Sequence, residues 1–211
     1  EEGADAGIAD FLPGDRMLLF VGKLVDKKGP TELIQILATI HQMQPDLRVH
    51  VAFIGSGELR DRLKDVAQSL GVREFVHVLG ARDQVIITEF QNFTDLFVMP
   101  YVWQEPFGLV PFEAALCGTP TVIPSDAGAA SAVTDAPWLF TTVDKRADGT
   151  IDIQKFAEAI IARLQADAKY SNVNGEPYWQ VANRYILNSF GWDVHAEKVA
   201  SIAREVLSQQ N

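Results

Sequence analysis

The sequence predicts an α/β protein whose mostly parallel sheet is covered by helices on both faces. Short apolar segments alternate with longer amphipathic segments almost from end to end of the chain. An apolar run bounded by turn residues is typical of a buried strand, whereas apolar residues that recur about every 3.6 positions indicate a helix. Strands that alternate with helices form parallel βαβ units. The chain of 211 residues is long enough to bury one core of this kind, so we expect a single Rossmann-like domain.

The strands are expected where apolar residues follow one another without a break. Residues 17–21 (MLLFV) are a clear example, and residues 95–99 form another that Pro100 ends. Proline ends a strand because it has no backbone N–H to donate within a sheet. In chain order the expected strands span residues 17–21, 48–54, 75–79, 95–99, 121–123 and 138–141, the last at an edge of the sheet.

The helices are expected where apolar residues share one face. Residues 58–70 place Leu59, Leu63, Val66 and Leu70 at helical spacing, which is typical of a helix packed on a sheet. In chain order the expected helices span residues 31–43, 58–70, 84–93, 109–117, 152–164, 178–187 and 192–207, with a helical turn at 127–133 and polar loops at 144–150 and 171–177.

The charge balance excludes several classes of partner. Lys and Arg number 18 against 28 Asp and Glu, which gives a formal net charge of −10. Nucleic acids and anionic membrane surfaces are bound through positive charge, so neither is expected as a partner. No apolar run approaches the ~20 residues that a membrane span requires. We therefore expect no nucleic-acid partner and no membrane contact from this domain.

Cysteine and histidine give no sign of a disulfide or a metal site. Cys117 is the only cysteine, which excludes an internal disulfide and fits a reducing, cytoplasmic compartment. His41, His50, His77 and His195 lack the spacing of metal ligands. We expect neither a metal site nor a cofactor.

Residues 101–120 (YVWQEPFGLVPFEAALCGTP) carry the strongest functional pattern. They follow the expected strand 95–99 with a glycine-containing turn and a helix start, which is where parallel sheets bind ligands. Gly108 lets the backbone approach a ligand, and the amides of a first helical turn carry partial positive charge. Glu113 offers two acceptor oxygens to neighbouring hydroxyls. The site suits a ligand with both hydroxyls and negative charge, and a nucleotide sugar has both.

The surroundings of the two glutamates leave alternatives. Glu113 lies between Phe112 and Ala114 in an apolar helix, and burial of an unpaired carboxylate costs several kcal/mol, so we expect a strong partner for it. The alternatives are a solvated helix position for Glu113 and an exposed loop carboxylate for Glu105. A glycosidase would need two carboxyl groups ~5–10 Å apart across an open cleft, and nothing else in the sequence builds a glycan groove.

The first expected strand ends in the densest positive cluster of the chain, which includes Lys23, Lys27 and Lys28. Positive charge at the carboxyl end of a strand is well placed to hold a diphosphate, and the alternative is a solvated turn. The second strand ends at Gly55-Ser56-Gly57. Arg60 stands where a dinucleotide fingerprint requires a third glycine, so a site of that kind is not expected.

Residues 105–120 resemble the E-x7-E signature of retaining GT-B glycosyltransferases, especially family 4 (glycosyl transferases group 1), whose pattern runs EPFGLxxxEAMAxGTPVV. Here the matching segments read EPFGL and EAALCGTP. The resemblance implies the C-terminal, donor-binding half of a GT-B fold, in which two Rossmann-like domains face each other. It implies that Glu113 bonds the ribose hydroxyls of a nucleotide-sugar donor and that Glu105 lies near the donor sugar. The turn amides that would bind sugar hydroxyls are those of Phe107, Gly108 and Leu109.

Other strand ends carry further parts of this resemblance. Residues 22–29 are similar to the family's G-R-L-x-x-x-K-G motif, in which an Arg and a Lys hold the donor pyrophosphate. Lys28 matches the Lys, whereas Lys23 stands where Arg is usual and lacks the bidentate fork of a guanidinium. The catalytic residues implied are Lys23, Lys28 and Glu105. The donor-binding residues implied are Gly22, Gly55, Gly57, Gly80, Ala81, Arg82, Glu105, Phe107, Gly108, Leu109 and Glu113, with Gly80 to Arg82 against the nucleobase.

The implied function is transfer of a sugar from a nucleotide diphosphate to a hydroxyl acceptor with retention of configuration. No metal is implied, because lysines and helix-start amides would stabilise the diphosphate leaving group. After residues 125–128 the family continues G-x-P-E, where this chain has Ala129-Ala130-Ser131-Ala132, a departure that bears on the identity of the donor. The alternative function is a non-catalytic module that binds a nucleotide sugar with the same fold.

The resemblance also implies a division of the chain. Residues 1–15 are acidic and begin without Met, so we expect a linker-like tail and an excised fragment. Residues 16–188 would form the nucleotide-sugar-binding domain, and residues 189–211 a helix that packs towards the missing N-terminal domain. That domain would supply most of the acceptor site, so the fragment alone is expected to be inactive.

Overall fold

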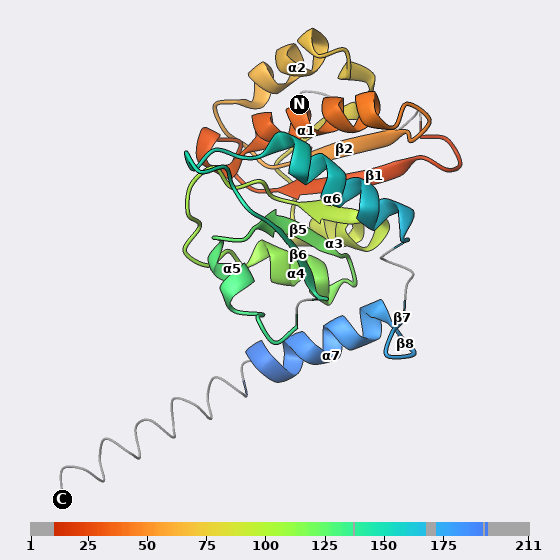
Figure 1. Cartoon of the computed structure of the whole chain (residues 1–211), viewed down its shortest axis with the longest axis vertical. Helices are drawn as coiled ribbons and strands as arrows, with labels where there is room; N and C mark the ends of the chain where they lie inside the picture. The colour runs from red at the N-terminus through yellow and green to blue at the C-terminus, as the bar shows by residue number, and fades with distance from the viewer. Residues whose placement is uncertain (1–10, 137, 168–171, 192, 194–211) are drawn as a thin grey trace, which may run out of the picture.

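A parallel six-stranded sheet forms the centre of the molecule (Figure 1). The computed structural model describes residues 11–136, 138–167, 172–191 and 193. The strand order is β3-β2-β1-β4-β5-β6, and every neighbouring pair runs parallel. The strands are β1 (Arg16–Val21), β2 (Val49–Ile54), β3 (Val76–Gly80), β4 (Leu96–Val98), β5 (Thr121–Pro124) and β6 (Phe140–Val143).

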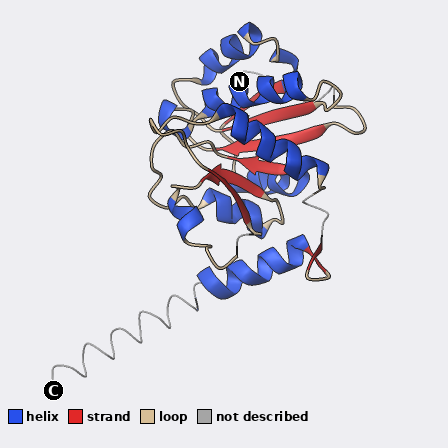
Figure 2. Cartoon of the chain, in the orientation of Figure 1, coloured by secondary structure: helices blue, strands red, loops and turns tan. Residues whose placement is uncertain are grey.

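Helices cover both faces of this sheet, as Figure 2 shows. On one face α1 packs between α2 and α6, and on the other α4 contacts α3 and α7. The helices are α1 (Pro30–Met43), α2 (Arg60–Ser69), α3 (Gln84–Phe93), α4 (Val110–Leu116), the short α5 (Gly128–Ser131), α6 (Ile153–Gln165) and α7 (Tyr178–Phe190). In the described part of the chain no helix is both long and apolar enough to cross a membrane.

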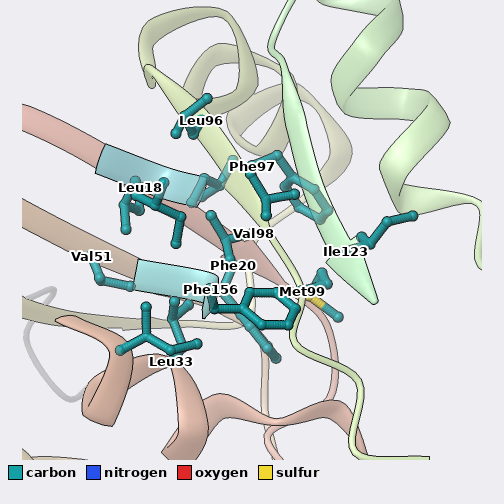
Figure 3. Close-up of a cluster of buried hydrophobic side chains, with 14 of the residues drawn as sticks. Leu18, Phe20, Leu33, Val51, Leu96, Phe97, Val98, Met99, Ile123 and Phe156 are labelled. Carbon is teal, nitrogen blue, oxygen red and sulfur yellow. The ribbon is translucent and has the colours of Figure 1, made fainter. Parts of the chain in front are cut away.

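The core explains why the central strands are uninterrupted apolar runs. Leu18, Phe20 and Phe97 lie within the sheet with no exposed surface. Leu33 of α1 and Phe156 of α6 pack on one face of the sheet and are equally buried (Figure 3). A strand that is covered on both faces has no solvent side on which to place polar residues.

The predicted strands and helices that fall on described residues are confirmed, with ends that shift by a few residues. The helix expected from residue 58 begins at Arg60, because Leu59 still belongs to the preceding turn and donates its backbone N–H to Leu24 O. The last strand begins at Phe140 rather than at residue 138. The helix expected over 178–187 continues to Phe190. The helix expected over 192–207 lies outside the described residues, apart from residue 193.

The loop expected over 171–177 contains a minimal hairpin. Its strands are β7 (Asn172–Val173) and β8 (Glu176–Pro177), which pair antiparallel. The two residues between them both have positive φ, 53° for Asn174 and 86° for Gly175. Asn-Gly is the dipeptide that favours such a tight hairpin turn.

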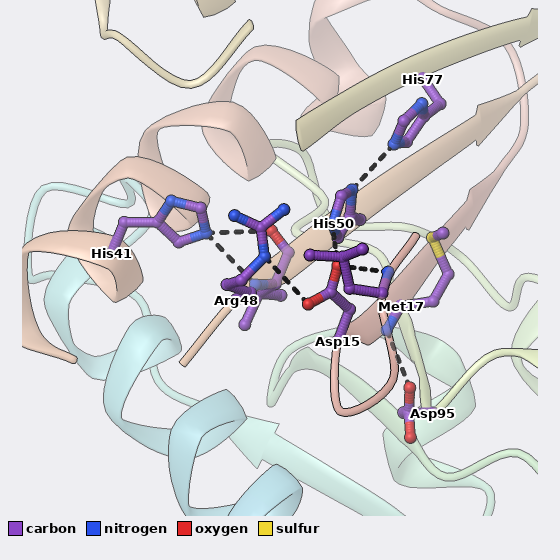
Figure 4. A network of polar contacts seen from close by, with 9 residues as sticks. Asp15, Met17, His41, Arg48, His50, His77 and Asp95 are labelled. Carbon is purple, nitrogen blue, oxygen red and sulfur yellow. Dashed lines mark hydrogen bonds and ion pairs between the residues drawn. The ribbon is translucent and has the colours of Figure 1, made fainter. Parts of the chain in front are cut away.

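A buried polar network lies at the amino ends of β1 and β2 (Figure 4). The Asp15 carboxylate accepts from His50 Nε2 at 2.9 Å and from Arg48 Nε at 3.0 Å. It also accepts from the Leu12 backbone N–H at 3.0 Å. Burial alone would raise the pKa of Asp15, but these three hydrogen bonds hold it below its ordinary value. Asp15, at the end of the expected tail, is therefore packed into the folded domain.

Candidate functional site

The candidate site lies at the carboxyl ends of β1, β4 and β5. The strand order reverses between β1 and β4, since the chain leaves β1 towards β2 on one side and later returns to β4 on the other. Such a reversal opens a crevice between the loops that leave the two strands. Three loops meet there, formed by residues 22–29 after β1, 99–109 after β4 and 125–127 after β5.

The loops after β1 and β2 lie backbone against backbone. Gly22 N donates to Ile54 O at 3.0 Å, and Leu24 N donates to Ser56 O at 2.9 Å. A Cβ built on Gly55 would stand 1.8 Å from Gly22 O, so any side chain there would separate the loops. A Cβ on Gly57 would likewise stand 2.3 Å from Leu24 O, so Gly55 and Gly57 have a structural reason to be glycine, whereas a Cβ on Gly22 would make only ordinary contacts at 3.5 Å or more.

Lys28 and Glu105 form the centre of the site, although 77 positions separate them in the sequence. Lys28 Nζ lies 2.5 Å from Glu105 Oε2, and their side chains are only 20% and 11% exposed. The Trp103 indole Nε1–H donates to the same oxygen at 2.9 Å. The exposed loop carboxylate considered for Glu105 is wrong, because the carboxylate is buried and shared by two donors.

Lys23 lies apart from this centre. Its side chain is exposed and has no hydrogen bond or ion pair to another described residue. The structure therefore brings together two of the three expected catalytic residues, Lys28 and Glu105, and leaves the third at the solvent-facing rim of the β1 loop.

Gly108 shapes the turn that carries the expected sugar-binding amides. Its φ is +78°, a conformation that other residues rarely adopt. A Cβ there would also lie 3.1 Å from the hydroxyl of Tyr101 and 3.4 Å from Cγ of Glu105. The flanking side chains of Phe107 and Leu109 are 40% and 65% exposed. The turn is therefore narrow on its inner side and apolar on its outer side.

Glu113 lies in the first turn of α4 with its carboxylate half-buried. It has no hydrogen bond or ion pair to any described side chain, so the strong partner expected from its apolar surroundings is not found among these residues. Burial raises the pKa of Glu113 above its ordinary value. A ligand that donates hydroxyl hydrogens would relieve this cost.

Tyr101 was not identified from the sequence. Its ring is buried beneath the turn, and Lys28 Nζ lies 5.2 Å from the ring centre. Burial, with a smaller contribution from the negative charge of Glu105, raises the pKa of Tyr101 above its usual range. The only sequence signal was its place directly after Pro100, at the end of β4.

The residues expected near a nucleobase lie at the carboxyl end of β3. Gly80 O accepts from Gly55 N at 2.9 Å, and Arg82 Nη1 donates to Ala81 O at 3.1 Å. The guanidinium groups of Arg60 and Arg82 both come within 4 Å of where a Gly80 Cβ would stand. The sequence used Arg60 only to exclude a dinucleotide site, and the structure adds it to this edge of the sheet.

Lys145 is a further residue that the sequence did not single out. It follows β6, and its Nζ contacts Asp126 Oδ2 at 2.9 Å and the carbonyl oxygens of Val102 and Trp103 at 3.2 Å each. It thereby joins the loop after β4 to the loop after β5. Among the described residues no three His, Cys, Asp or Glu side chains gather in a way that could hold a metal ion.

Comparison with models of protein families identifies the family of the chain. The model described as Glycosyl transferases group 1 matches residues 7–172, which is most of the chain. The chain belongs to this family.

Similar proteins carry glycosyltransferase names. The uncharacterized glycosyltransferase MJ1607 of Methanocaldococcus jannaschii is 37% identical over 114 residues, which are 54% of this chain and 28% of that protein. A D-inositol 3-phosphate glycosyltransferase of Corynebacterium urealyticum is 34% identical over 196 residues, which are 90% of this chain and 43% of that protein. The chain thus matches less than half the length of these relatives.

A solved chain has the same fold. Alr3699/HepE of Anabaena, in complex with UDP, matches with a TM-score of 0.73 at 22% identity, over 91% of this chain and 49% of that chain. The same protein has also been solved with UDP-glucose, where the TM-score is 0.66. The match and the six-stranded parallel sheet confirm the expected Rossmann-like half of a GT-B glycosyltransferase.

Proposed function

We propose that this glycosyltransferase chain is a donor-binding domain that holds a nucleoside diphosphate sugar at the carboxyl edge of its sheet. In the whole protein, the sugar would pass to a hydroxyl acceptor with retention of configuration. The bond from the anomeric carbon to the diphosphate oxygen breaks, a bond to the acceptor oxygen forms, and the acceptor proton is released. The acceptor is expected to enter through a second domain.

One observation carries this proposal. Two groups with unused hydrogen-bonding capacity lie at the same edge of the sheet. Glu113 is a half-buried carboxylate without a described partner, and the Lys28 ammonium has one carboxylate contact. Lys28 has three N–H donors and gives one of them to Glu105, which leaves donors for phosphate oxygens. Glu113 can accept from two neighbouring hydroxyls, as a ribose offers. The two groups fit opposite parts of one nucleotide.

The remaining residues complete the proposed chemistry. The amides of Phe107, Gly108 and Leu109 face hydroxyls of the sugar, and Glu105 lies beside it. Lys28, aided by Lys23 at the rim, stabilises negative charge as the diphosphate leaves, because charge-assisted hydrogen bonds strengthen as charge develops on the oxygen. We propose that this happens without a metal ion. We also propose a cytoplasmic location, which the single cysteine of the chain supports.

A thermal-unfolding screen tests the donor proposal. The chain is heated with UDP, GDP and ADP and with their glucose conjugates, UDP and UDP-glucose being the ligands of the Anabaena structures. A ligand present at a hundred times its dissociation constant adds ~2.7 kcal/mol to stability. Stabilisation by one nucleoside diphosphate, lost in Lys28→Ala but kept in the surface variant Lys155→Ala, is the expected result. No stabilisation by any of these ligands would contradict the proposal.

A second assay separates a transferase from a non-catalytic module. The chain alone is expected to transfer no sugar, whereas a longer protein that includes the second domain is expected to do so. Binding without transfer by that longer protein would indicate the non-catalytic alternative. Sugar transfer by the chain alone would overturn the assignment of the acceptor site to another domain.

A further inference from the structure

Among the described lysines at this end of the sheet, Lys145 makes the most hydrogen bonds. Its side chain is only 10% exposed, although a lysine ammonium is strongly hydrated in water. It is paired with the Asp126 carboxylate at 2.9 Å and also donates to two backbone carbonyls. An ammonium has three N–H donors, and these contacts use all of them. The cation is therefore held in one place and keeps no donor for a ligand.

The two carbonyls that Lys145 binds belong to the segment that precedes Glu105. They are those of Val102 and Trp103, each 3.2 Å from Nζ. The same segment is held from its other side, since Val102 N donates to Lys27 O at 3.1 Å. The backbone at residues 102 and 103 is thus fixed between the loop after β1 and the loop after β6.

The side chain of Trp103 links this fixed backbone segment to Glu105 at the centre of the site. Its indole Nε1–H donates to Glu105 Oε2 at 2.9 Å, the oxygen that Lys28 Nζ contacts at 2.5 Å. Lys27 Nζ lies over the indole, 4.4 Å from the ring centre, and restricts the ring further. A displacement of the Trp103 backbone would therefore move a hydrogen-bond donor away from Glu105.

The loop after β5 is tied to the same segment at a second point. Asp126, the carboxylate partner of Lys145, precedes Gly128, whose N–H donates to Glu105 O at 2.9 Å. Lys145 and this hydrogen bond hold the Glu105 segment from opposite ends. The departure from the family's G-x-P-E pattern, at residues 129–132, follows directly after this loop.

We propose that Lys145 is a positioning residue that fixes the Trp103 indole on Glu105 and thereby sets the sugar-binding half of the donor site. The inference rests on the proposed function, because it assigns Glu105 to the sugar and Lys28 to the diphosphate. The contacts of Lys145 are with Val102, Trp103 and Asp126 and include none of the residues assigned to the diphosphate, so its effect is expected on the sugar side. Its loss therefore reduces the affinity that the sugar adds, while the affinity for the nucleoside diphosphate is kept.

The test compares Lys145→Met with the matched control Lys155→Met, whose lysine is 59% exposed on α6. Calorimetric titration with UDP and with UDP-glucose gives two dissociation constants for each variant. In Lys145→Met the ratio between them is expected to change by tenfold or more, with UDP affinity within threefold of the wild type. Lys155→Met is expected to keep both values. Equal loss of both affinities, or no loss of either, would contradict the positioning role.

A readout without ligand separates this inference from the proposed function. The indole N–H signal of Trp103, assigned by its absence in Trp103→Phe, is expected to shift in Lys145→Met and to stay in place in Lys155→Met. If Lys145→Met does not fold, Asp126→Asn takes its place, because it weakens the same cation site while keeping the lysine. An unchanged indole signal overturns the inference. If the signal shifts but the chain binds no nucleotide, the link between Lys145 and the Trp103 indole is supported and the proposed function is overturned.

Discussion

Both ends of the sheet contain buried carboxylates and basic side chains, but those at the amino end are hydrogen-bonded to one another and those at the carboxyl end are only partly so. At the amino end, Asp15, Arg48 and His50 satisfy one another, and the Asp15 carboxylate accepts three hydrogen bonds. At the carboxyl end, Glu113 is half-buried without a described partner, and the ammonium of Lys28 has a single carboxylate contact. Burial raises the pKa of Glu113, whereas hydrogen bonds outweigh burial and lower that of Asp15.

This difference shows how stability and binding are divided in the molecule. A buried polar group that is fully hydrogen-bonded contributes to the folded state and has nothing left for a ligand. A buried carboxylate without a partner costs stability, and a ligand can recover that cost. We therefore expect changes at the amino end to affect unfolding, and changes at the carboxyl end to affect nucleotide binding.

The largest effect is expected from Asp15→Ala, which leaves the buried His50 and the Arg48 guanidinium without their carboxylate. Leaving a buried donor unsatisfied costs about 1–3 kcal/mol of unfolding free energy, and the loss of the Asp15 carboxylate removes the acceptor of three donors. Urea unfolding at neutral pH measures this loss, with the exposed Asp65→Ala as the control. Nucleotide affinity is expected to stay unchanged at temperatures where the variant is folded. A loss of affinity without a loss of stability would reverse the division between the two ends.

The Asp15 contribution also has a defined pH range. Because its folded-state pKa lies below the unfolded value near 3.8, the stabilisation is present above that value and is lost as pH falls through the folded-state pKa. The difference in stability between wild type and Asp15→Ala is expected to shrink below about pH 4. A difference that stays constant down to pH 2 would mean that Asp15 acts through packing alone.

Lys28→Ala is expected to weaken nucleoside diphosphate binding by about 1.5–3 kcal/mol, the range for a charge-assisted contact. The bare nucleoside should lose much less, because it has no phosphate for the ammonium to contact. Calorimetric titration of both ligands, with Lys155→Ala alongside, measures the two losses. Equal losses for nucleoside and diphosphate would show that Lys28 does not contact phosphate.

Glu113→Gln separates ribose recognition from folding. The amide keeps the shape and one acceptor oxygen but loses the charge, so binding should weaken by roughly 1–3 kcal/mol. Without ligand, the melting temperature should stay the same or rise, because a half-buried negative charge is removed. Normal binding together with unfolding several degrees earlier would identify Glu113 as a structural residue.

The smallest effect is expected for the change in nucleotide affinity with pH as the Glu113 carboxylate is protonated. Its pKa is raised, so the carboxylate destabilises the folded state as pH rises above about 4.5, its ordinary value. A hydroxyl ligand prefers the ionised form, so wild-type affinity should approach that of Glu113→Gln as pH falls through the raised pKa. The ratio of the two affinities, measured from pH 7 downwards, cancels the titration of the phosphate itself. A ratio that does not change with pH would exclude the charged carboxylate from the contact.

Local patterns were sufficient to predict the fold and part of the site. The helix at 84–93 is found at the predicted bounds, because its apolar spacing and its cap Asp83, which accepts from Ile86 N, are local features of the sequence. The apolar neighbours of Glu113 led us to expect its burial, and its carboxylate is half-buried. Lys28 and Glu105 were identified through motif resemblance, but their direct contact across 77 positions depends on how the β1 and β4 loops meet.

The remaining polar contacts depend on tertiary packing and leave no local pattern. Lys145 binds carbonyls of residues 42 and 43 positions earlier, and backbone carbonyls are present at every position. Asp15 and His50 are 35 positions apart, and each looks isolated in the sequence. Only the parallel pairing of β1 with β2 brings their ends together.

The most direct test of the division between the two ends is a titration of the isotope-labelled chain with the nucleoside diphosphate that stabilises it most, followed by NMR of the backbone amides. The largest shifts are expected at Lys28, Gly108 and Glu113, with the amides of Asp15 and His50 unchanged. Shifts centred on Asp15 and His50, or no shifts at a saturating concentration, would contradict a nucleotide site at the carboxyl edge of the sheet.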